Sequence, residues 1–144
     1  MNQTIEALNR QVADFGVLYV KLHNYHWLVN GPQFYQLHML FEKLYDETAE
    51  RLDEVAERIL QIGGVPLASL KEFLARTALL EARGNETPIE MINQTIYDFT
   101  TVNEGVRTSL KTAQDEGDEN TVDLLIGISK SLEKHLWMLG ALEK

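Results

Sequence analysis

Two histidines and a run of acidic residues in the first half of the chain have the types and spacing that suit metal binding. His26 and His38 flank the turn Asn30-Gly31-Pro32. The carboxylates after His38 follow at steps of three or four residues and therefore share one helix face: Glu42, Asp46, Glu50, Asp53 and Glu57. Imidazoles and carboxylates together form mixed nitrogen and oxygen sites, which suit Fe(II), zinc or manganese and permit redox chemistry with a peroxide or dioxygen.

Each of these residues also has a purely structural interpretation. An acidic stripe is typical of a solvated helix face, and a histidine on an apolar stripe is more often a core residue than a ligand. This stripe departs from that pattern because it begins with His38 beside the core and lies next to His26, which is on a core stripe. His23 and His135 keep the core interpretation, and the sequence assigns them no role.

The acidic face extends too far for all of these groups to bind one ion within one chain. His38 and Asp53 are fifteen residues apart, which is about 22 Å along a helix axis. If two copies pack these helices antiparallel about a two-fold axis near residue 47 or 48, however, His38 and Glu42 of one copy come level with Asp53 and Glu57 of the other. Such a pair would contain two identical sites, each completed by His26.

A di-iron centre inside a single helical bundle is not expected from this sequence. Such centres take Glu from two helices and a Glu-x-x-His motif from each of the other two. The residues three positions before the four histidines are Val20, His23, Tyr35 and Leu132, so the motif does not occur.

Apolar periodicity predicts an all-α fold with four long helices and almost no strand signal. We expect helices over residues 4–29 and 33–62, a short helix within SLKEFLAR, a third long helix capped by Thr87-Pro88, and a fourth after the loop 116–120. The fourth helix should face inward with Leu125, Ile128, Leu132, Leu139 and Leu142. Because the second and third long helices are separated by a connection that could cross the bundle, the pattern predicts a ferritin-like four-helix bundle.

Composition narrows the class of protein further. The 144 residues, 44% of them hydrophobic, suffice for one domain over residues 1–144. The chain has no cysteine, which excludes disulfides, thiolate metal sites and cysteine nucleophiles. We expect a soluble, cytoplasmic protein, since neither a signal peptide nor a long apolar run is visible. The net charge of -9 and the lack of a basic cluster make nucleic acid a poor partner.

Two motifs resemble those of the Dps proteins, or mini-ferritins, and the wider similarity covers essentially the whole chain. The first motif is His26-Trp27, Gly31, Leu37-His38 and Glu42; the second is Leu52-Asp53, Val55-Ala56-Glu57-Arg58, Gly63 and Pro66. The resemblance implies a hollow homododecamer with ferroxidase sites at its two-fold interfaces. In each site, His26 and His38 would come from one subunit and Asp53 and Glu57 from its neighbour.

The implied reaction is oxidation of Fe(II), preferably by hydrogen peroxide, with storage of an Fe(III) mineral inside the shell and protection against oxidative stress. Glu57 would bridge two irons and Glu42 would help to hold the second, weaker one. Family members most often carry aspartate at the position of Glu42, so this chain departs from the family pattern at the second iron. Zinc is expected to compete with iron for the site.

Three further residues acquire roles only through this resemblance. Trp27 is similar to a family tryptophan thought to intercept stray oxidising equivalents, although a core aromatic would explain it as well. Asp123, and more weakly Glu119, match the acidic pores through which iron enters, while Glu116 and Asp118 would only add negative potential.

An architectural protein that binds nucleoid DNA, with an incidental metal site, is the alternative function. The DNA-binding members of the family carry lysine-rich tails. Here the first basic residue is Arg10, and only Lys144 follows Glu143 at the other end of the chain. A helical bundle with an interaction role alone is a third possibility.

Overall fold

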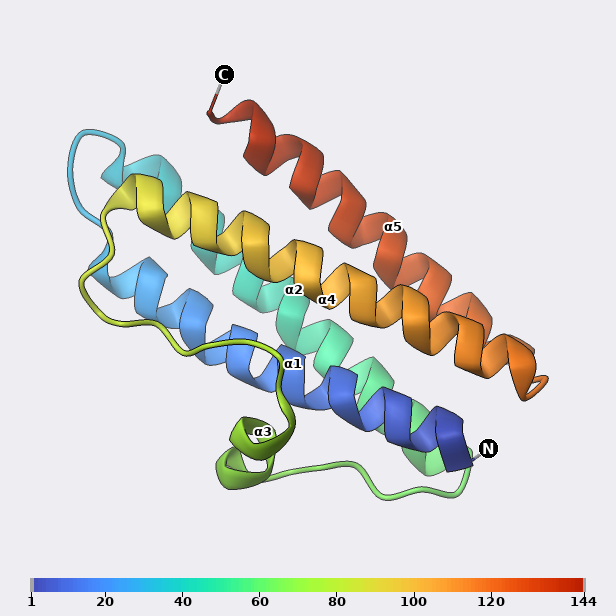
Figure 1. Ribbon diagram of the computed structural model, residues 1–144. Helices are drawn as coiled ribbons and strands as arrows, with labels where there is room; N and C mark the ends of the chain where they lie inside the picture. The colour runs from blue at the N-terminus through green and yellow to red at the C-terminus, as the bar shows by residue number, and fades with distance from the viewer. Residues whose placement is uncertain (1, 144) are drawn as a thin grey trace.

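The computed structural model describes residues 2–143, in which all regular structure is helical. Five helices follow one another along the chain: α1 (Asn2–Leu28), α2 (Phe34–Gln61), α3 (Leu70–Arg76), α4 (Pro88–Asp115) and α5 (Glu119–Ala141). Figure 1 shows the four long helices side by side, with the short α3 outside them. The predicted all-α, ferritin-like bundle is confirmed, including the short helix between the second and third long helices. Met1 and Lys144, the ends of the expected domain, lie outside the described residues.

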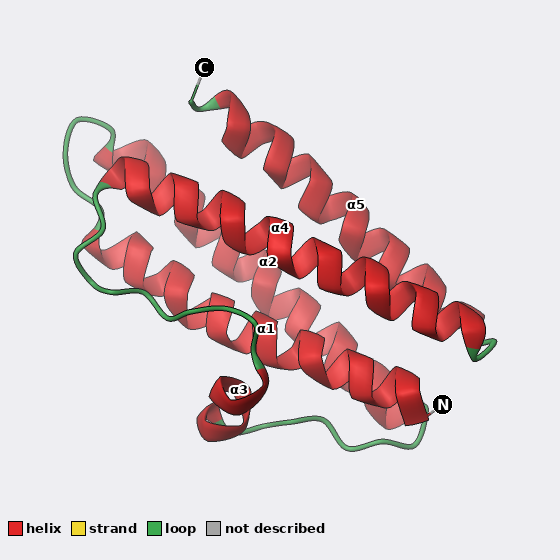
Figure 2. Ribbon diagram, in the orientation of Figure 1, coloured by secondary structure: helices red, strands yellow, loops and turns green. Residues whose placement is uncertain are grey.

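The long helices form two antiparallel pairs, α1 with α2 and α4 with α5, and α1 joins the pairs by packing against α4. The connection between α2 and α4 runs back along the whole bundle and places α3 against α1 (Figure 2). As a result, α4 begins at the end of the bundle where α1 finishes, and it runs in the same direction as α2. This long crossover is the arrangement that the spacing of the helices predicts.

Local chemistry explains where the helices begin and end. Thr87 and Glu90 form a complete capping box at the start of α4, with Pro88 in its first turn. Asp118 accepts a hydrogen bond from the Thr121 backbone N–H, so α5 begins at Glu119, earlier than the predicted loop 116–120 allows. Gly31 adopts a φ of 98° between α1 and α2, a conformation in which other residues are strained.

The core contains most of the apolar residues predicted to face inward. Leu125, Ile128, Leu132 and Leu139 of α5 are buried, as expected. The prediction that Leu142 faces inward is wrong, because this residue is 53% exposed. It is the C-cap residue of α5, so it lies beyond the last turn, where helical periodicity no longer predicts which face a side chain takes.

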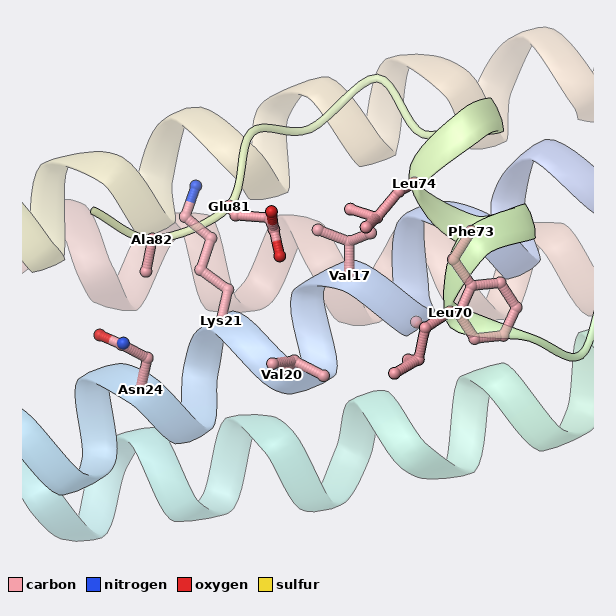
Figure 3. Close-up of a pocket in the computed structure, with 10 residues that line it drawn as sticks. Val17, Val20, Lys21, Asn24, Leu70, Phe73, Leu74, Glu81 and Ala82 are labelled. Carbon is pink, nitrogen blue, oxygen red and sulfur yellow. The ribbon is translucent and has the colours of Figure 1, made fainter. Parts of the chain in front are cut away.

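The connection between α2 and α4 is held on α1 by apolar and polar contacts. A cavity of about 200 Å³ lies between them, lined by Val17, Val20, Lys21 and Asn24 of α1, Leu70, Phe73 and Leu74 of α3, and Glu81 and Ala82. Figure 3 shows these side chains converging from the two segments. Deeper in the bundle, the Lys21 ammonium lies 2.7 Å from both the Asp98 carboxylate and the Leu80 carbonyl oxygen. This buried ion pair fixes the second half of α1 against α4.

No helix among residues 2–143 combines the length and apolar character needed to cross a membrane.

Candidate metal centre

The turn between α1 and α2 brings His26 and His38 into direct contact. His26 lies in the last turn of α1 and His38 in the second turn of α2. Their rings are stacked, with centroids 3.7 Å apart and planes inclined by 15°. The expectation that the turn carries the two histidines together is therefore confirmed, and both belong to one end of the bundle.

Each of the two histidines is oriented by the backbone of the other. His26 Nδ1 lies 2.7 Å from the His38 carbonyl oxygen, and His38 Nδ1 lies 2.7 Å from the His26 carbonyl oxygen. A carbonyl oxygen only accepts hydrogen bonds, so both Nδ1 atoms carry the proton and donate it. Both neutral rings are therefore in the tautomer that leaves a lone pair on Nε2. This lone pair can bind a metal ion while the Nδ1 proton is donated to a carbonyl oxygen.

The end of α1 makes this reciprocal arrangement possible. The last four carbonyl groups of a helix have no partner within it, and the His26 carbonyl is one of them because α1 ends at Leu28. It is therefore free to accept the proton of His38. On the other side, the rings are packed between aromatic groups: Phe34 stacks on His38 with centroids 5.0 Å apart, and Tyr45 meets His26 edge-on at 5.3 Å.

Glu42 supplies the carboxylate nearest to the histidine pair. Its Oε1 lies 3.9 Å from His26 Nε2, and its side chain is 54% exposed while that of His26 is 8% exposed. The next turn of α2 adds Tyr45, whose pKa is raised by burial and by the carboxylates of Glu42 and Asp46. The phenol therefore keeps its proton at neutral pH. We call His26, His38 and Glu42 the histidine half of the centre.

Asp53 and Glu57 form a second, separate group, which we call the acid half. Both are exposed on the C-terminal part of α2, and neither makes a hydrogen bond or ion pair within residues 2–143. Because α2 is one continuous helix, His38 and Asp53 lie about 22 Å apart along it. Within the described chain, no three His, Cys, Asp or Glu side chains are grouped closely enough to hold a metal ion.

The backbone that carries the acid half is anchored to α5. Arg58, the neighbour of Glu57, donates one hydrogen bond to Asp118 at 2.8 Å and another to the Thr121 hydroxyl at 2.9 Å. Burial raises the pKa of Asp118, but hydrogen bonds from Thr121 and the Arg58 guanidinium outweigh it and hold that pKa below its ordinary value. Arg58 thus fixes the helix while the neighbouring Glu57 carboxylate remains unengaged.

Comparison with known proteins places this chain in a family. A ferritin-like domain family matches residues 5–144. The DNA protection during starvation protein 2 of Bacillus anthracis is 50% identical over 139 residues, which make up 96% of this chain and 95% of that protein. The crystal structure of a Dps protein from Bacillus brevis superposes with a TM-score of 0.98 at 44% identity, covering 99% of this chain and 96% of that one.

The chain belongs to the Dps family. The Dps protein of Vibrio cholerae, with a TM-score of 0.96 and 30% identity over 99% of this chain and 90% of its own, is described as a member of a broad superfamily of ferritin-like diiron-carboxylate proteins. The resemblance inferred from the two sequence motifs is confirmed. The roles of individual residues are a separate matter, because the family name assigns none of them.

Trp27 of this Dps chain is not a core aromatic. Its side chain is 69% exposed, and its ring meets His23 with centroids 5.3 Å apart. His23 in turn donates its Nδ1 proton to the Tyr19 carbonyl oxygen. His135 is buried, as the core interpretation expected, and its Nε2 contacts Glu47 of α2.

The acidic residues near the start of α5 fall into two groups. Glu119 and Asp123 are exposed and four residues apart, so they share one face of the first turns of the helix. Asp118 is buried and paired with Arg58, and Glu116 accepts hydrogen bonds from the backbone N–H and hydroxyl of Thr4. Of these four residues, Glu119 and Asp123 are therefore the two whose carboxylates are exposed.

Sequence reasoning missed Tyr45, which contacts the histidine half. Its position three residues after Glu42 on the same helix is a signal that could have found it.

Proposed function

We propose that this protein is a ferroxidase and iron-storage protein that protects the cell against oxidative damage. It oxidises Fe(II), with hydrogen peroxide as the preferred oxidant, at sites shared between two subunits of a homododecamer. The Fe(III) product is stored as a mineral inside the shell. We further propose that residues 1–144 form one domain and that the protein is located in the cytoplasm.

The single observation that carries this proposal is the reciprocal bonding of His26 and His38. Two stacked imidazoles whose Nδ1 protons are both donated to carbonyl oxygens hold their two Nε2 lone pairs ready for a metal ion. A core histidine needs only one hydrogen bond of any kind, whereas this arrangement selects the ligand tautomer twice. The nearby Glu42 carboxylate adds a charged oxygen donor that suits Fe(II).

A second subunit supplies the rest of the coordination shell. Asp53 and Glu57 cannot reach the histidines of their own chain, because α2 separates them by about 22 Å. Antiparallel pairing of two α2 helices about a two-fold axis near residue 47 or 48 places each acid half beside the partner's histidine half. The free Asp53 and Glu57 carboxylates are consistent with ligands that await such a partner.

The chemistry follows from this donor set. His26, His38 and Asp53 hold one Fe(II), and Glu57 bridges to a second iron that Glu42 helps to hold. Each of the two Fe(II) ions gives one electron to a single peroxide molecule. The O–O bond breaks, the two oxygen atoms take up protons, and they leave as water. Because both electrons reach the same peroxide, no hydroxyl radical is released in this reaction.

Fe(II) must also enter the shell to reach these sites. Glu119 and Asp123 lie exposed at the start of α5, where we propose that they line acidic pores that attract Fe(II) into the shell. Zinc prefers similar nitrogen and oxygen donors and competes for the histidine half.

Paired ligand variants test the proposal directly. We expect His26→Ala/His38→Ala and Asp53→Ala/Glu57→Ala each to slow peroxide-driven Fe(II) oxidation more than about tenfold, since even the outer partners of metal ligands are worth about 10–100-fold. Native mass measurements should show intact shells in both cases. Unchanged initial rates in either double variant would refute the site.

Co-assembly tests whether the site is shared. Subunits of the two double variants, dissociated and reassembled together, should recover part of the oxidation rate, because some interfaces then combine two intact halves. A mixture that assembles but regains no activity would show that each subunit carries its own complete site.

Binding to DNA is the competing function, favoured by the name of the Bacillus anthracis relative, a DNA protection during starvation protein. The net charge of -9 opposes it, because binding to phosphates requires Lys and Arg contacts. A gel-shift assay at neutral pH across a range of salt concentrations separates the two functions. We expect no shifted band, and tight, salt-sensitive binding would support the architectural role.

A further inference from the structure

The turn between α1 and α2 contains the only Asn-Gly sequence of the chain, Asn30-Gly31. Asn30 is exposed and belongs to neither helix, because α1 ends at Leu28 and α2 begins at Phe34. Figure 1 shows this turn projecting beyond the ends of the two helices. Asn30 follows His26 by only four residues, so a chemical change in the turn acts directly on the histidine half.

The Asn30 side chain has no structural partner in this turn. Asparagine is common in turns because its side chain bonds to the nearby backbone and because it tolerates left-handed geometry. Here Asn30 makes no hydrogen bond within residues 2–143, and the positive φ of 98° belongs to Gly31 instead. Neither common reason for an asparagine applies, and its carboxamide is free to rotate.

The backbone nitrogen of Gly31 is open to this carboxamide. Among the described residues its N–H makes no hydrogen bond, whereas the Gly31 carbonyl oxygen accepts one from the Phe34 N–H at 3.0 Å. A Cβ added to Gly31 would meet no atom within 4 Å, and glycine has no side chain that could shield the nitrogen. Nothing in the turn therefore keeps the Gly31 nitrogen away from Asn30 Cγ.

We propose that Asn30 is a site of spontaneous deamidation, which converts it to aspartate or isoaspartate and weakens the histidine half as the protein ages. The Gly31 nitrogen gives its proton to hydroxide and attacks Asn30 Cγ. The new C–N bond closes a five-membered succinimide ring, and the side-chain nitrogen takes a proton from water and leaves as ammonia.

Water then opens the succinimide ring at one of its two carbonyl groups. Attack at the side-chain carbonyl leaves aspartate on an ordinary backbone. Attack at the backbone carbonyl leaves isoaspartate, in which the main chain passes through the former side chain. The net change is the exchange of an amide for a carboxylate by one water molecule, with no transfer of electrons.

The two products act differently on the histidines. Isoaspartate lengthens the main chain by one carbon atom, whereas His26 and His38 are held by reciprocal contacts of 2.7 Å across the turn. The longer turn shifts one helix end against the other and loosens these contacts. Aspartate keeps the length of the turn and adds a negative charge, which attracts Fe(II). This consequence rests on the proposed function, while the deamidation itself does not depend on iron.

Asn85 provides an internal control for the chemistry. It is exposed in the loop between α3 and α4, as Asn30 is in its turn. The next residue is Glu86, whose side chain shields its own backbone nitrogen. The Glu86 carboxylate also accepts hydrogen bonds from the Arg83 and Gly84 backbone N–H groups, which hold this loop in shape. The two asparagines thus share exposure and differ in the nitrogen that would attack them.

Incubation of the unmodified protein tests the modification without any variant. Samples are kept in buffers of increasing pH and analysed by peptide mass spectrometry, with electron-transfer fragmentation to distinguish isoaspartate from aspartate. We expect Asn30 to gain the mass of an NH2 to OH exchange several times faster than Asn85. The rate should rise with pH, because the attacking nitrogen must lose its proton. Conversion at Asn30 that is absent, or no faster than at Asn85, would overturn the proposal.

Asn30→Gln and Asn85→Gln test the link to the histidine half. Glutamine has one more methylene group and would need a six-membered ring, which closes far more slowly. Fe(II) binding is measured by calorimetry before and after incubation. We expect binding to weaken in the parent and in Asn85→Gln and to stay unchanged in Asn30→Gln. An incubated Asn30→Gln that weakens as much as the parent would overturn the link.

Asn30→Asp separates the added charge from the longer main chain. Without incubation, this variant carries the carboxylate on an ordinary backbone, and we expect it to bind Fe(II) at least as tightly as the fresh parent. Weaker binding would show that the charge, and not isoaspartate, damages the site. A fresh parent that binds no Fe(II) would refute the proposed function, and the mass measurement at Asn30 would still decide whether deamidation occurs.

Discussion

The histidine half and the acid half occupy opposite ends of α2 and are built in different ways. At the first end, His26 and His38 are held by hydrogen bonds to each other's backbone and enclosed by aromatic rings. At the second end, Arg58 ties the helix to Asp118, the N-cap of α5, and to Thr121 within it, while Asp53 and Glu57 make no hydrogen bond or ion pair within residues 2–143. One half has fixed ligands, and the other has free ligands on a fixed helix.

This difference indicates what each half requires before a metal ion arrives. An imidazole has two nitrogen atoms, so the chain must choose the tautomer and the ring orientation in advance. A carboxylate is already charged and has two equivalent oxygens, so it needs only a correctly placed backbone. The conformational freedom lost on binding iron is therefore expected to come mainly from the side chains of the acid half.

Breaking the support of the histidine half should produce the largest loss of stability. Burial raises the pKa of Asp98, although Lys21 and Gln94 oppose that rise. Asp98→Ala leaves the Lys21 ammonium buried without its carboxylate, which costs about 3–5 kcal/mol. Urea unfolding at fixed protein concentration measures this loss. Lys21→Met/Asp98→Leu removes both charges and should recover most of it, and a double variant as unstable as Asp98→Ala would contradict this account.

The support of the acid half should be the next most costly to remove. Arg58→Met loses three hydrogen bonds, one of them to the buried Asp118 carboxylate, and should destabilise the protein by about 1.5–3 kcal/mol. Because Asp53 and Glu57 would then sit on a less firmly held helix, the Fe(II) oxidation rate should also fall. Urea unfolding and stopped-flow absorbance test the two effects, and a stability equal to that of the parent would show that Arg58 is not an anchor.

Alanine substitutions at two glycines, one at each end of α2, allow the two halves to be compared with matched changes of the backbone. Gly31 and Gly63 flank α2, have φ angles of 98° and 90°, and have no atoms within 4 Å of an added Cβ. Gly31→Ala and Gly63→Ala should each cost about 1 kcal/mol, since both force a side chain into left-handed geometry. Only Gly31→Ala lies between the two histidines, so only it should weaken Fe(II) binding measured by calorimetry. Equal weakening by both would show that the turn does not orient the histidines.

The smallest effect concerns the pH dependence of the contact between α1 and the end of α4. Hydrogen bonds from the Thr4 hydroxyl and backbone N–H lower the pKa of Glu116 to about 2. A lowered folded-state pKa stabilises the protein above the ordinary pKa of about 4.3, and the stabilisation disappears as the pH falls toward 2. Thr4→Val should therefore reduce stability at pH 6 and converge with the parent near pH 2 in urea unfolding. A constant difference across that range would exclude the Glu116 carboxylate as its cause.

The helices and the histidine half were largely predictable from the sequence, because both depend on short-range patterns. Apolar steps of three and four residues set the long helices, and Thr87-Pro88 and Gly31-Pro32 mark their ends. His26 and His38 are twelve positions apart with a single turn between them, so the two rings are brought to the same end of the bundle. The fifteen-residue spacing between His38 and Asp53 likewise separates the two halves in any helical conformation.

Contacts between helices were not predictable, since they depend on how each helix is rotated and shifted against its neighbours. Periodicity predicts the two helices that carry His23 and Tyr45, but only the packing of α1 on α2 stacks these rings at 3.7 Å. The same packing leaves Trp27 exposed and pairs Lys21 with Asp98 from distant parts of the chain. The sequence by itself thus determined which side chains could bind iron and along which helix they lie. Tertiary structure decided their tautomers, their aromatic neighbours and their supports, because those depend on carbonyl groups and rings that only folding brings together.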